Sequence, residues 1–123
     1  MLNIKKLLTQ MLTPEHYTNY TLPSTVVMGF DIYRVGPVVS INISNPTKMA
    51  AQNNAILTLP EGWRPISPLG ASFMLNAPTS SGVSSQTLRM TINTAGALNI
   101  YNYSSAISGN TNINQTCTYI AGK

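Results

Sequence analysis

The residues able to act as acids or bases are few in this chain of 123 residues, which holds three carboxylates and one histidine. A glycosidase needs two carboxyl groups roughly 5–10 Å apart, one as the acid and one as the base or nucleophile. Glu15 adjoins His16 in a polar connecting segment, Asp31 lies in an alternating segment, and Glu61 lies in a turn. Because groups so scattered rarely converge on one substrate, we predict no catalytic residue and no enzymatic activity.

Metal and cofactor binding also lack a sequence motif. One His, one Cys and three separated acids offer no zinc or calcium ligand spacing, and no glycine-rich nucleotide-binding loop is present. The single cysteine, Cys117, excludes an intrachain disulfide, and its apolar, β-like surroundings predict a small buried hydrophobe. We therefore predict no metal site and no cofactor.

Carbohydrate binding asks for groups that this chain has in quantity, namely aromatic faces for a sugar ring and amides or hydroxyls for its hydroxyl groups. Asn99, Tyr101 and Tyr103 share one face of a predicted strand, and Asn102 lies between the two tyrosines. We predict these four residues as ligand-binding. The alternative is that the tyrosines pack at a subunit interface or a strand edge, where half-buried tyrosines are common.

A turn motif over residues 59–65, Leu-Pro-Glu-Gly-Trp-Arg-Pro, supplies two further possible ligand contacts, Trp63 and Arg64. Pro60 has no N–H and must end the preceding strand, while Gly62 is free to adopt a positive φ. A large ring beside turn prolines normally covers the end of a core, so a structural role for Trp63 is the favoured interpretation. Arg64 could stack on that ring or bind a phosphate-bearing glycan.

The composition argues against nucleic acid and membrane partners. The formal net charge of +4 comes from seven cations scattered along the chain, whereas a phosphate-binding groove needs a basic stripe. No segment approaches the roughly 18 consecutive apolar residues of a membrane span. Ser, Thr and Asn are abundant in place of charge, which suits strands joined by turns.

The N-terminal segment predicts a short α-helix over residues 2–12. Ile4, Leu7, Leu8 and Met11 fall on one face at helical spacing, and Pro14 stops the helix. A helix of three turns is marginal in water, so its apolar stripe must pack against its own domain, a symmetry mate or a neighbouring protein. We assign residues 1–24 to this helix and a connector with an assembly or anchor role.

Residues 25–123 read as an all-β head domain, because the apolar pattern changes to period two. Gly36-Pro37 and Thr94-Ala95-Gly96 each join two alternating runs, which predicts two hairpins, and Asn45-Pro46 breaks a strand. The pattern gives about seven strands, the spacing of an antiparallel sandwich or open barrel. The predicted strands cover residues 29–35, 38–44, 55–59, 71–77, 88–92, 97–103 and 116–120.

Three pieces in this order resemble the C-terminal modules of bacteriophage tail-fibre and baseplate receptor-binding proteins, particularly of phages and prophages of Gram-positive bacteria. The pieces are the Tyr-Arg hairpin over residues 33–39, the turn motif over residues 59–65 and the hairpin over residues 92–98. Gly36 follows Arg34 after one residue where the family pattern has two. No collagen-like repeat or coiled-coil shaft precedes the module, which suggests a small accessory tip.

The resemblance implies a β-sandwich or jelly-roll-like head, usually a homotrimer, that attaches a virion to bacterial cell-surface saccharide without cleaving it. The N-terminal helix would then be the assembly element, either as a three-helix seam of the homotrimer or as a plug into another tail or baseplate protein. The resemblance transfers no particular sugar-binding residue. The alternatives are a purely structural fibre, spike or capsid decoration protein, and a polysaccharide depolymerase.

Overall fold

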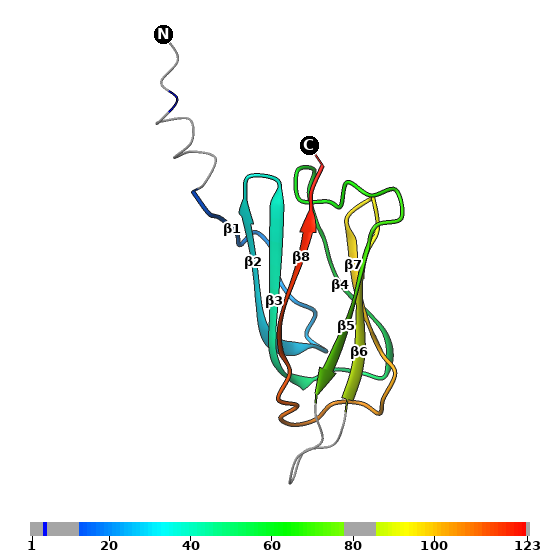
Figure 1. Cartoon of the computed structure of the whole chain (residues 1–123). Coiled ribbons are helices and arrows are strands. Elements are labelled where there is room, and N and C mark those ends of the chain that lie inside the picture. The colour runs from blue at the N-terminus through cyan, green and yellow to red at the C-terminus, as the bar shows by residue number, and fades with distance from the viewer. Residues whose placement is uncertain (1–3, 5–12, 78–85, 123) are drawn as a thin grey trace.

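Two four-stranded antiparallel sheets form the fold, and their apolar inner faces meet as a β-sandwich (Figure 1). The computed structural model describes residues 4, 13–77 and 86–122. Within these residues every assigned element is a strand. The all-β prediction is confirmed, with eight strands rather than about seven.

The first sheet has the strand order β1-β2-β3-β8. β2 and β3 form the predicted hairpin, with Val35 opposite Val38 across the turn at Gly36 and Pro37. β8 lies on the other side of β3, with Cys117 opposite Ile41. The bounds of these strands are Glu15–Tyr17 for β1, Val27–Val35 for β2, Val38–Lys48 for β3 and Asn114–Ile120 for β8.

The second sheet has the order β4-β7-β6-β5. β5, β6 and β7 are joined as consecutive hairpins, and β7 pairs on its other side with β4, the first strand of the four in sequence. This is a Greek-key arrangement. A jelly roll mixes early and late strands in both sheets, whereas here β4 to β7 form one sheet by themselves, so the jelly-roll-like expectation is not met. The bounds are Gln52–Thr58 for β4, Ala71–Ala77 for β5, Gln86–Ile92 for β6 and Ala97–Asn102 for β7.

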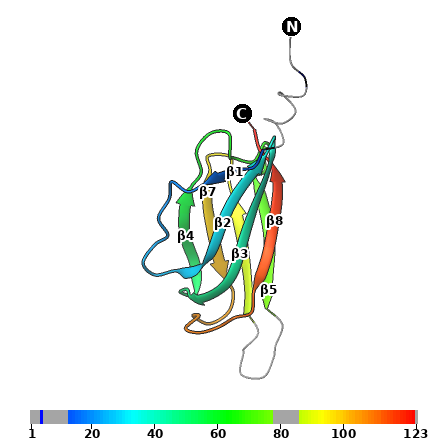
Figure 2. The same ribbon diagram turned by 90° about the vertical axis from the view of Figure 1, so that its left-hand side faces the viewer.

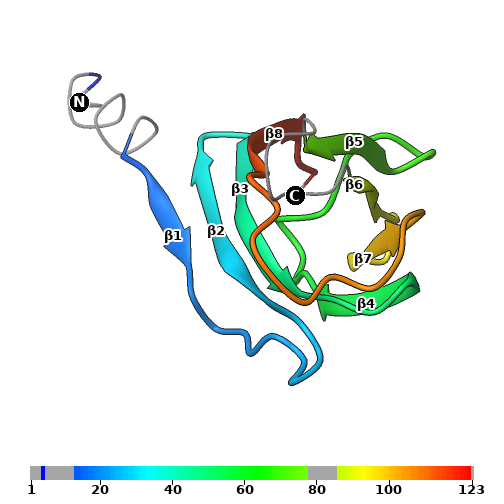
Figure 3. The same cartoon turned by 90° about the horizontal axis from the view of Figure 1, so that it is seen from below.

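The core lies between the two sheets, which Figure 3 shows end-on. Both sheets place every second side chain inward, as period-two patterning requires. The largest fully buried side chains come from both sheets and from the connections at their ends: Ile32, Ile41, Ile43, Met49, Leu59, Leu75, Leu88, Met90, Ile92, Leu98, Ile100 and Ile113. Cys117 is also buried, as predicted.

The two ends of the sandwich are formed by different connections (Figures 1 and 2). The motif end holds the Gly36-Pro37 turn, the connection of residues 59–70 and the Thr94–Gly96 turn. The pocket end, opposite to it, holds the β3–β4 connection of residues 49–51 and the β7–β8 connection of residues 103–113.

Three expectations about the chain's organisation need correction or fall outside the described residues. The polar connector contains a strand, because β1 pairs with β2 and places Glu15 opposite Arg34. Asn45-Pro46 does not end its strand; β3 continues to Lys48 past a shift in register, where β8 no longer pairs with it. The helix expected over residues 2–12 is not among the assigned elements, and apart from Ile4 those residues lie outside the described part.

Candidate functional site

The two predicted tyrosines lie together on the outer face of the second sheet. Tyr101 is 37% exposed and Tyr103 is 55% exposed. Their ring centroids are 4.7 Å apart with an angle of 49° between the ring planes. Asn99 lies on the same side of β7, two residues before Tyr101, so the prediction that these three residues share a face is confirmed.

The turn of residues 93–96, which precedes β7, sets the register in which β7 begins. The Asn93 side-chain oxygen accepts hydrogen bonds from the backbone N–H groups of Ala95 at 3.0 Å and Ala97 at 2.9 Å. Gly96 has a φ of 89°, and a Cβ at this position would overlap the Leu59 carbonyl oxygen. The turn therefore requires glycine, and it starts β7 in the register that directs Tyr101 outward.

The strands on both sides of β7 add further residues to the site. Asn53 of β4 and Arg89 of β6 both lie directly opposite Tyr101, and Met74 of β5 lies opposite Arg89. Arg89 Nε donates to Ser72 Oγ at 2.8 Å. We call this surface the tyrosine face: it consists of the outward side chains of β4 to β7, with Asn53, Ser72, Met74, Arg89, Asn99 and Tyr101, together with Tyr103 directly after β7.

The tyrosine face carries a cation and no acid among the described residues. Glu15 and Asp31 belong to the first sheet, and Glu61 lies in the connection at the motif end. Within the described part of the chain, no side-chain hydrogen bond is found for Asn53 or Asn99. The face thus combines two aromatic rings, free amides and a guanidinium, which are the groups that contact sugars.

Asn102 does not belong to this face. It is 1% exposed and points to the interior, where its Nδ2 donates to the carbonyl oxygens of Ala50 at 3.3 Å and Ser105 at 3.0 Å. Its Oδ1 accepts a hydrogen bond from the Ser104 N–H at 2.9 Å. The prediction that Asn102 contacts ligand is wrong, because its amide is used to hold the chain after β7.

Trp63 and Arg64 serve the scaffold at the motif end. Trp63 packs on the core and lies 5.4 Å from the Tyr17 ring, as the favoured structural interpretation predicted. The cation over its ring is Arg34, at 5.0 Å, and not its neighbour Arg64. Arg64 Nε instead donates to the Leu59 carbonyl oxygen at 2.9 Å.

The three motifs behind the family resemblance meet at the motif end. Arg34, of the first hairpin, donates through Nη1 to the carbonyl oxygen of Gly62 in the turn motif at 2.6 Å. Gly62 has a φ of 87°, in agreement with the predicted positive value. The Leu59 N–H of the same turn motif donates to the carbonyl oxygen of Gly96, in the second hairpin, at 2.8 Å. These motifs thus stabilise the corner of the sandwich and lie apart from the tyrosine pair.

The acidic side chains and the histidine do not form a pair of carboxyl groups at one site. Arg34 Nη2 donates to both carboxylate oxygens of Glu15, at 3.2 and 3.3 Å, and His16 Nε2 lies 3.5 Å from Asp31 Oδ1. Glu61 is exposed in the turn motif. In the described ranges, no group of three or more His, Cys, Asp or Glu residues is arranged to hold a metal ion. Burial raises the pKa of the Cys117 thiol, which leaves it protonated at neutral pH.

The assembly residues can be placed only in part. Ile4 is 64% exposed, so its side chain is free of the sandwich core. Leu7, Leu8 and Met11 lie outside the described residues. In the part of the chain that is described, no helix is long and apolar enough to cross a membrane.

Comparisons of this chain with protein-family models, with curated proteins and with solved structures gave no match.

Proposed function

We propose that this chain is a non-enzymatic host-attachment module of a bacteriophage tail fibre or baseplate, and that its tyrosine face binds bacterial cell-surface saccharide. The observation that carries the proposal is the exposed pair of Tyr101 and Tyr103 beside free amide groups. The phage context depends on the resemblance of the three motifs.

The geometry of the pair suits a polysaccharide chain. Each ring presents a surface for the apolar side of a sugar ring, and planes inclined at 49° offer two such surfaces in sequence. Asn53 lies opposite Tyr101 across the strand pair, so its amide is within reach of a sugar hydroxyl that extends beyond the ring. An open face also admits a polymer that a closed cavity would exclude.

Cleavage of the bound saccharide is not part of the proposal. Glu15 and Asp31 both lie on the first sheet, where Glu15 pairs with the Arg34 guanidinium and Asp31 lies 3.5 Å from His16. The tyrosine face has hydroxyls and a guanidinium, which bind sugars without supplying the two carboxyl groups that glycoside hydrolysis uses.

The positions of the chain termini and of the tyrosine pair at opposite ends of the sandwich suggest how the module is oriented in the virion. β1 begins beside Arg34 at the motif end, and the last described residue, Gly122, bonds there to the Arg64 carbonyl oxygen at 2.9 Å. β7 starts at the motif end and runs away from it, which places Tyr101 and Tyr103 toward the far end. We propose that residues 1–14 join other virion proteins or form a homotrimer seam, and that the pocket end of the sandwich approaches the cell.

A binding assay on intact bacterial walls tests the proposal. Tyr101→Ala and Tyr103→Ala are measured against Tyr33→Ala, a matched exposed tyrosine on the first sheet. Removing both rings should weaken wall binding by at least about fivefold, since each aromatic contact contributes about 0.5–1.5 kcal/mol. Tyr33→Ala should bind like the unaltered protein.

Three results would contradict the proposal. Absence of binding to every host and non-host wall would favour a purely structural fibre, spike or decoration protein. Shortening of purified polysaccharide by the protein would indicate a depolymerase. A monomer that persists at micromolar concentration in light scattering would contradict the homotrimer.

A further inference from the structure

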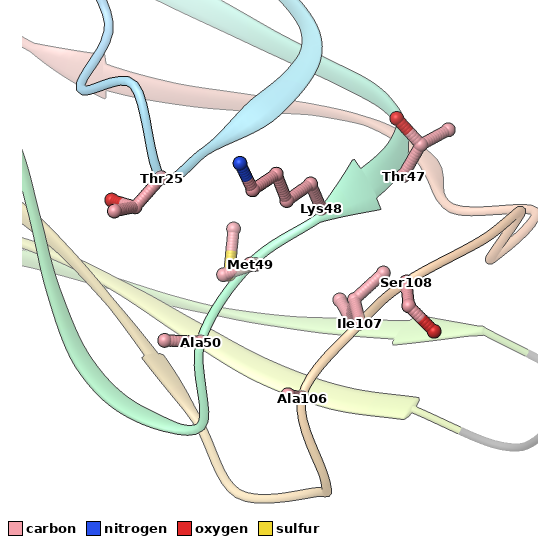
Figure 4. Close-up of a pocket in the computed structure, with 8 residues that line it drawn as sticks. All are labelled: Thr25, Thr47, Lys48, Met49, Ala50, Ala106, Ile107 and Ser108. Atoms are coloured by element: carbon pink, nitrogen blue, oxygen red, sulfur yellow. The ribbon is translucent and has the colours of Figure 1, made fainter.

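A pocket of about 470 Å³ opens at the pocket end of the sandwich (Figure 4). This volume lies within the range of small-molecule sites, which is roughly 300–1,000 Å³. Three segments that are distant in sequence line the pocket: Thr25 before β2, Thr47 to Ala50 at the end of β3, and Ala106 to Ser108 in the β7–β8 connection. The pocket contains no residue of the tyrosine face, so it is a separate feature.

The floor of the pocket is held by paired backbone hydrogen bonds. Met49 and Ile107 are buried and exchange both backbone hydrogen bonds, from Met49 N–H to Ile107 O at 3.1 Å and from Ile107 N–H to Met49 O at 2.7 Å. This pairing clamps the β3–β4 connection to the β7–β8 connection. Ala50 and Ala106 flank the pair, so small side chains keep the space above it open.

Two buried amides hold the walls in place. Asn54 Nδ2 and Asn102 Nδ2 both donate to the Ala50 carbonyl oxygen, at 3.0 and 3.3 Å. Asn102 also donates to Ser105, the residue before Ala106. A wall fixed in advance costs a ligand little ordering free energy, which is the condition for tight binding of a small molecule. This gives buried Asn102 a role that its sequence position did not suggest, as a positioning residue.

The charge at the pocket is positive. Lys48 is the single charged residue in the lining, and Thr25, Thr47 and Ser108 add hydroxyl groups. Lys48 Nζ donates to the Ser24 carbonyl oxygen at 3.3 Å. An ammonium has three donors, so it can bind an anion while keeping this contact. Since no carboxylate is in the lining, a positive ligand would find no partner there.

We propose that this pocket is a second binding site, for a small molecule that combines an apolar chain with one acidic group, either a carboxylate or a phosphate. The apolar chain lies against the exposed Ala50 and Ala106, over the buried Met49 and Ile107, and the acidic group accepts hydrogen bonds from Lys48 and the rim hydroxyls. The site is independent of the saccharide proposal, because the two share no contact residue.

Amide NMR shifts of the full chain, titrated with four six-carbon probes, test this site. The probes are hexanoate, hexyl phosphate, hexanol and hexylammonium. The two anions should shift the Met49, Ala50, Ala106 and Ile107 amides, and hexanol should bind roughly two- to fivefold more weakly, the range for one exposed ion pair. Hexylammonium should bind most weakly. The two anions distinguish carboxylate from phosphate preference by their relative affinities.

Matched variants separate the pocket from general effects. Ala106→Phe fills the pocket and should abolish the hexanoate shifts, while Ala95→Phe, at an exposed alanine of the motif end, should leave them unchanged. Lys48→Gln should remove the preference for anions, and Arg89→Gln on the tyrosine face should keep it. Equal binding of all four probes, shifts elsewhere in the chain, or full binding by Ala106→Phe would each overturn the proposal.

Discussion

The outer faces of the two sheets are built from similar residue types and differ in how those residues are used. On the first sheet, the polar side chains bond to one another across the strands: Ser40 Oγ lies 3.3 Å from Thr118 Oγ1, and Asn42 Nδ2 donates to Thr116 Oγ1 at 3.0 Å and to Asn114 Oδ1 at 3.2 Å. On the tyrosine face, the rings contact each other while Asn53 and Asn99 have no such bond in the described part of the chain.

The charged residues show the same difference. Arg34 of the first sheet contacts Glu15, Gly62 and Trp63, so both its terminal nitrogens have partners within the fold. Arg89 of the tyrosine face has a single hydroxyl contact, to Ser72, and no acidic partner among the described residues. A face whose polar groups are already paired offers a ligand little, so groups that lack internal partners mark a binding surface better than composition does.

The two arginines give the largest expected contrast. Arg34→Ala should lower the free energy of unfolding by about 2–3 kcal/mol, because it removes a cation–π contact and a charged hydrogen bond to a part-buried carbonyl. Arg89→Ala should change it by less than about 0.5 kcal/mol, as exposed substitutions do. Urea unfolding measures both. Equal losses would remove the distinction between the faces.

The pH dependence of the free energy of unfolding tests the contact between Tyr119 of the first sheet and the turn motif. Tyr119 is buried, and its hydroxyl donates to the Trp63 carbonyl oxygen at 2.5 Å. Burial raises the pKa of this phenol above its unfolded value of about 10. Its contribution to stability is therefore complete below pH 10 and is lost as the pH rises toward the folded-state pKa.

In the unaltered protein, this loss should approach about 1.4 kcal/mol per pH unit above pH 10. Tyr119→Phe removes the titrating group, so its unfolding free energy should fall less steeply over the same interval. Urea unfolding at pH 9, 10 and 11 provides the comparison. Parallel curves for the two proteins would show that Tyr119 does not titrate as the structure requires.

The asparagines of the two faces form a third pair. Asn42→Ala should destabilise the protein by about 1 kcal/mol, because it leaves Asn114 and Thr116 without their shared partner. Asn99→Ala should have little effect on stability and should weaken wall binding. Thermal unfolding of both variants measures the loss of stability, and the wall assay measures the loss of binding. A variant of Asn99 that destabilises as much as that of Asn42 would contradict the comparison.

The smallest expected effect concerns β1. His16 stacks on Tyr33 with ring centroids 4.3 Å apart and lies 3.5 Å from Asp31 Oδ1. All three side chains are exposed, so His16→Ala should cost only about 0.2–1 kcal/mol. Hydrogen exchange of the β2 amides would report local loosening of β1. Complete unfolding of this variant would show that β1 is more than an edge strand.

Alternation along single strands is enough to predict the core and the outward tyrosines. Leu98 and Ile100 are buried and Tyr101 is exposed, as period two requires. The same rule places Asn102 inward, so the signal that excludes it from the ligand site is present in the sequence. Its proximity to the tyrosines along the chain is a poorer guide to its role than its parity.

The partners across the sheet could not be predicted in this way. Asn53 lies opposite Tyr101 because β4 pairs with β7, and that pairing joins strands far apart in the sequence rather than following from local pattern. Arg89 lies opposite Tyr101 across the β6–β7 hairpin, whose existence the sequence predicts but whose register it does not fix. β1 is not predictable because three residues are too few to show a period. The stacking of Arg34, rather than Arg64, on Trp63 could not be predicted either, because this contact joins residues far apart in the sequence.

The most direct test of the central claim is a map of where saccharide binds. Amide NMR shifts of the ¹⁵N-labelled chain would be recorded during titration with enzyme-solubilised wall fragments from a panel of Gram-positive bacteria. We predict that the shifts concentrate at Asn53, Arg89, Tyr101 and Tyr103, and that Ser40, Asn42 and Thr118 on the first sheet do not move. Shifts centred on the first sheet, or no shifts with any wall fragment, would contradict the account.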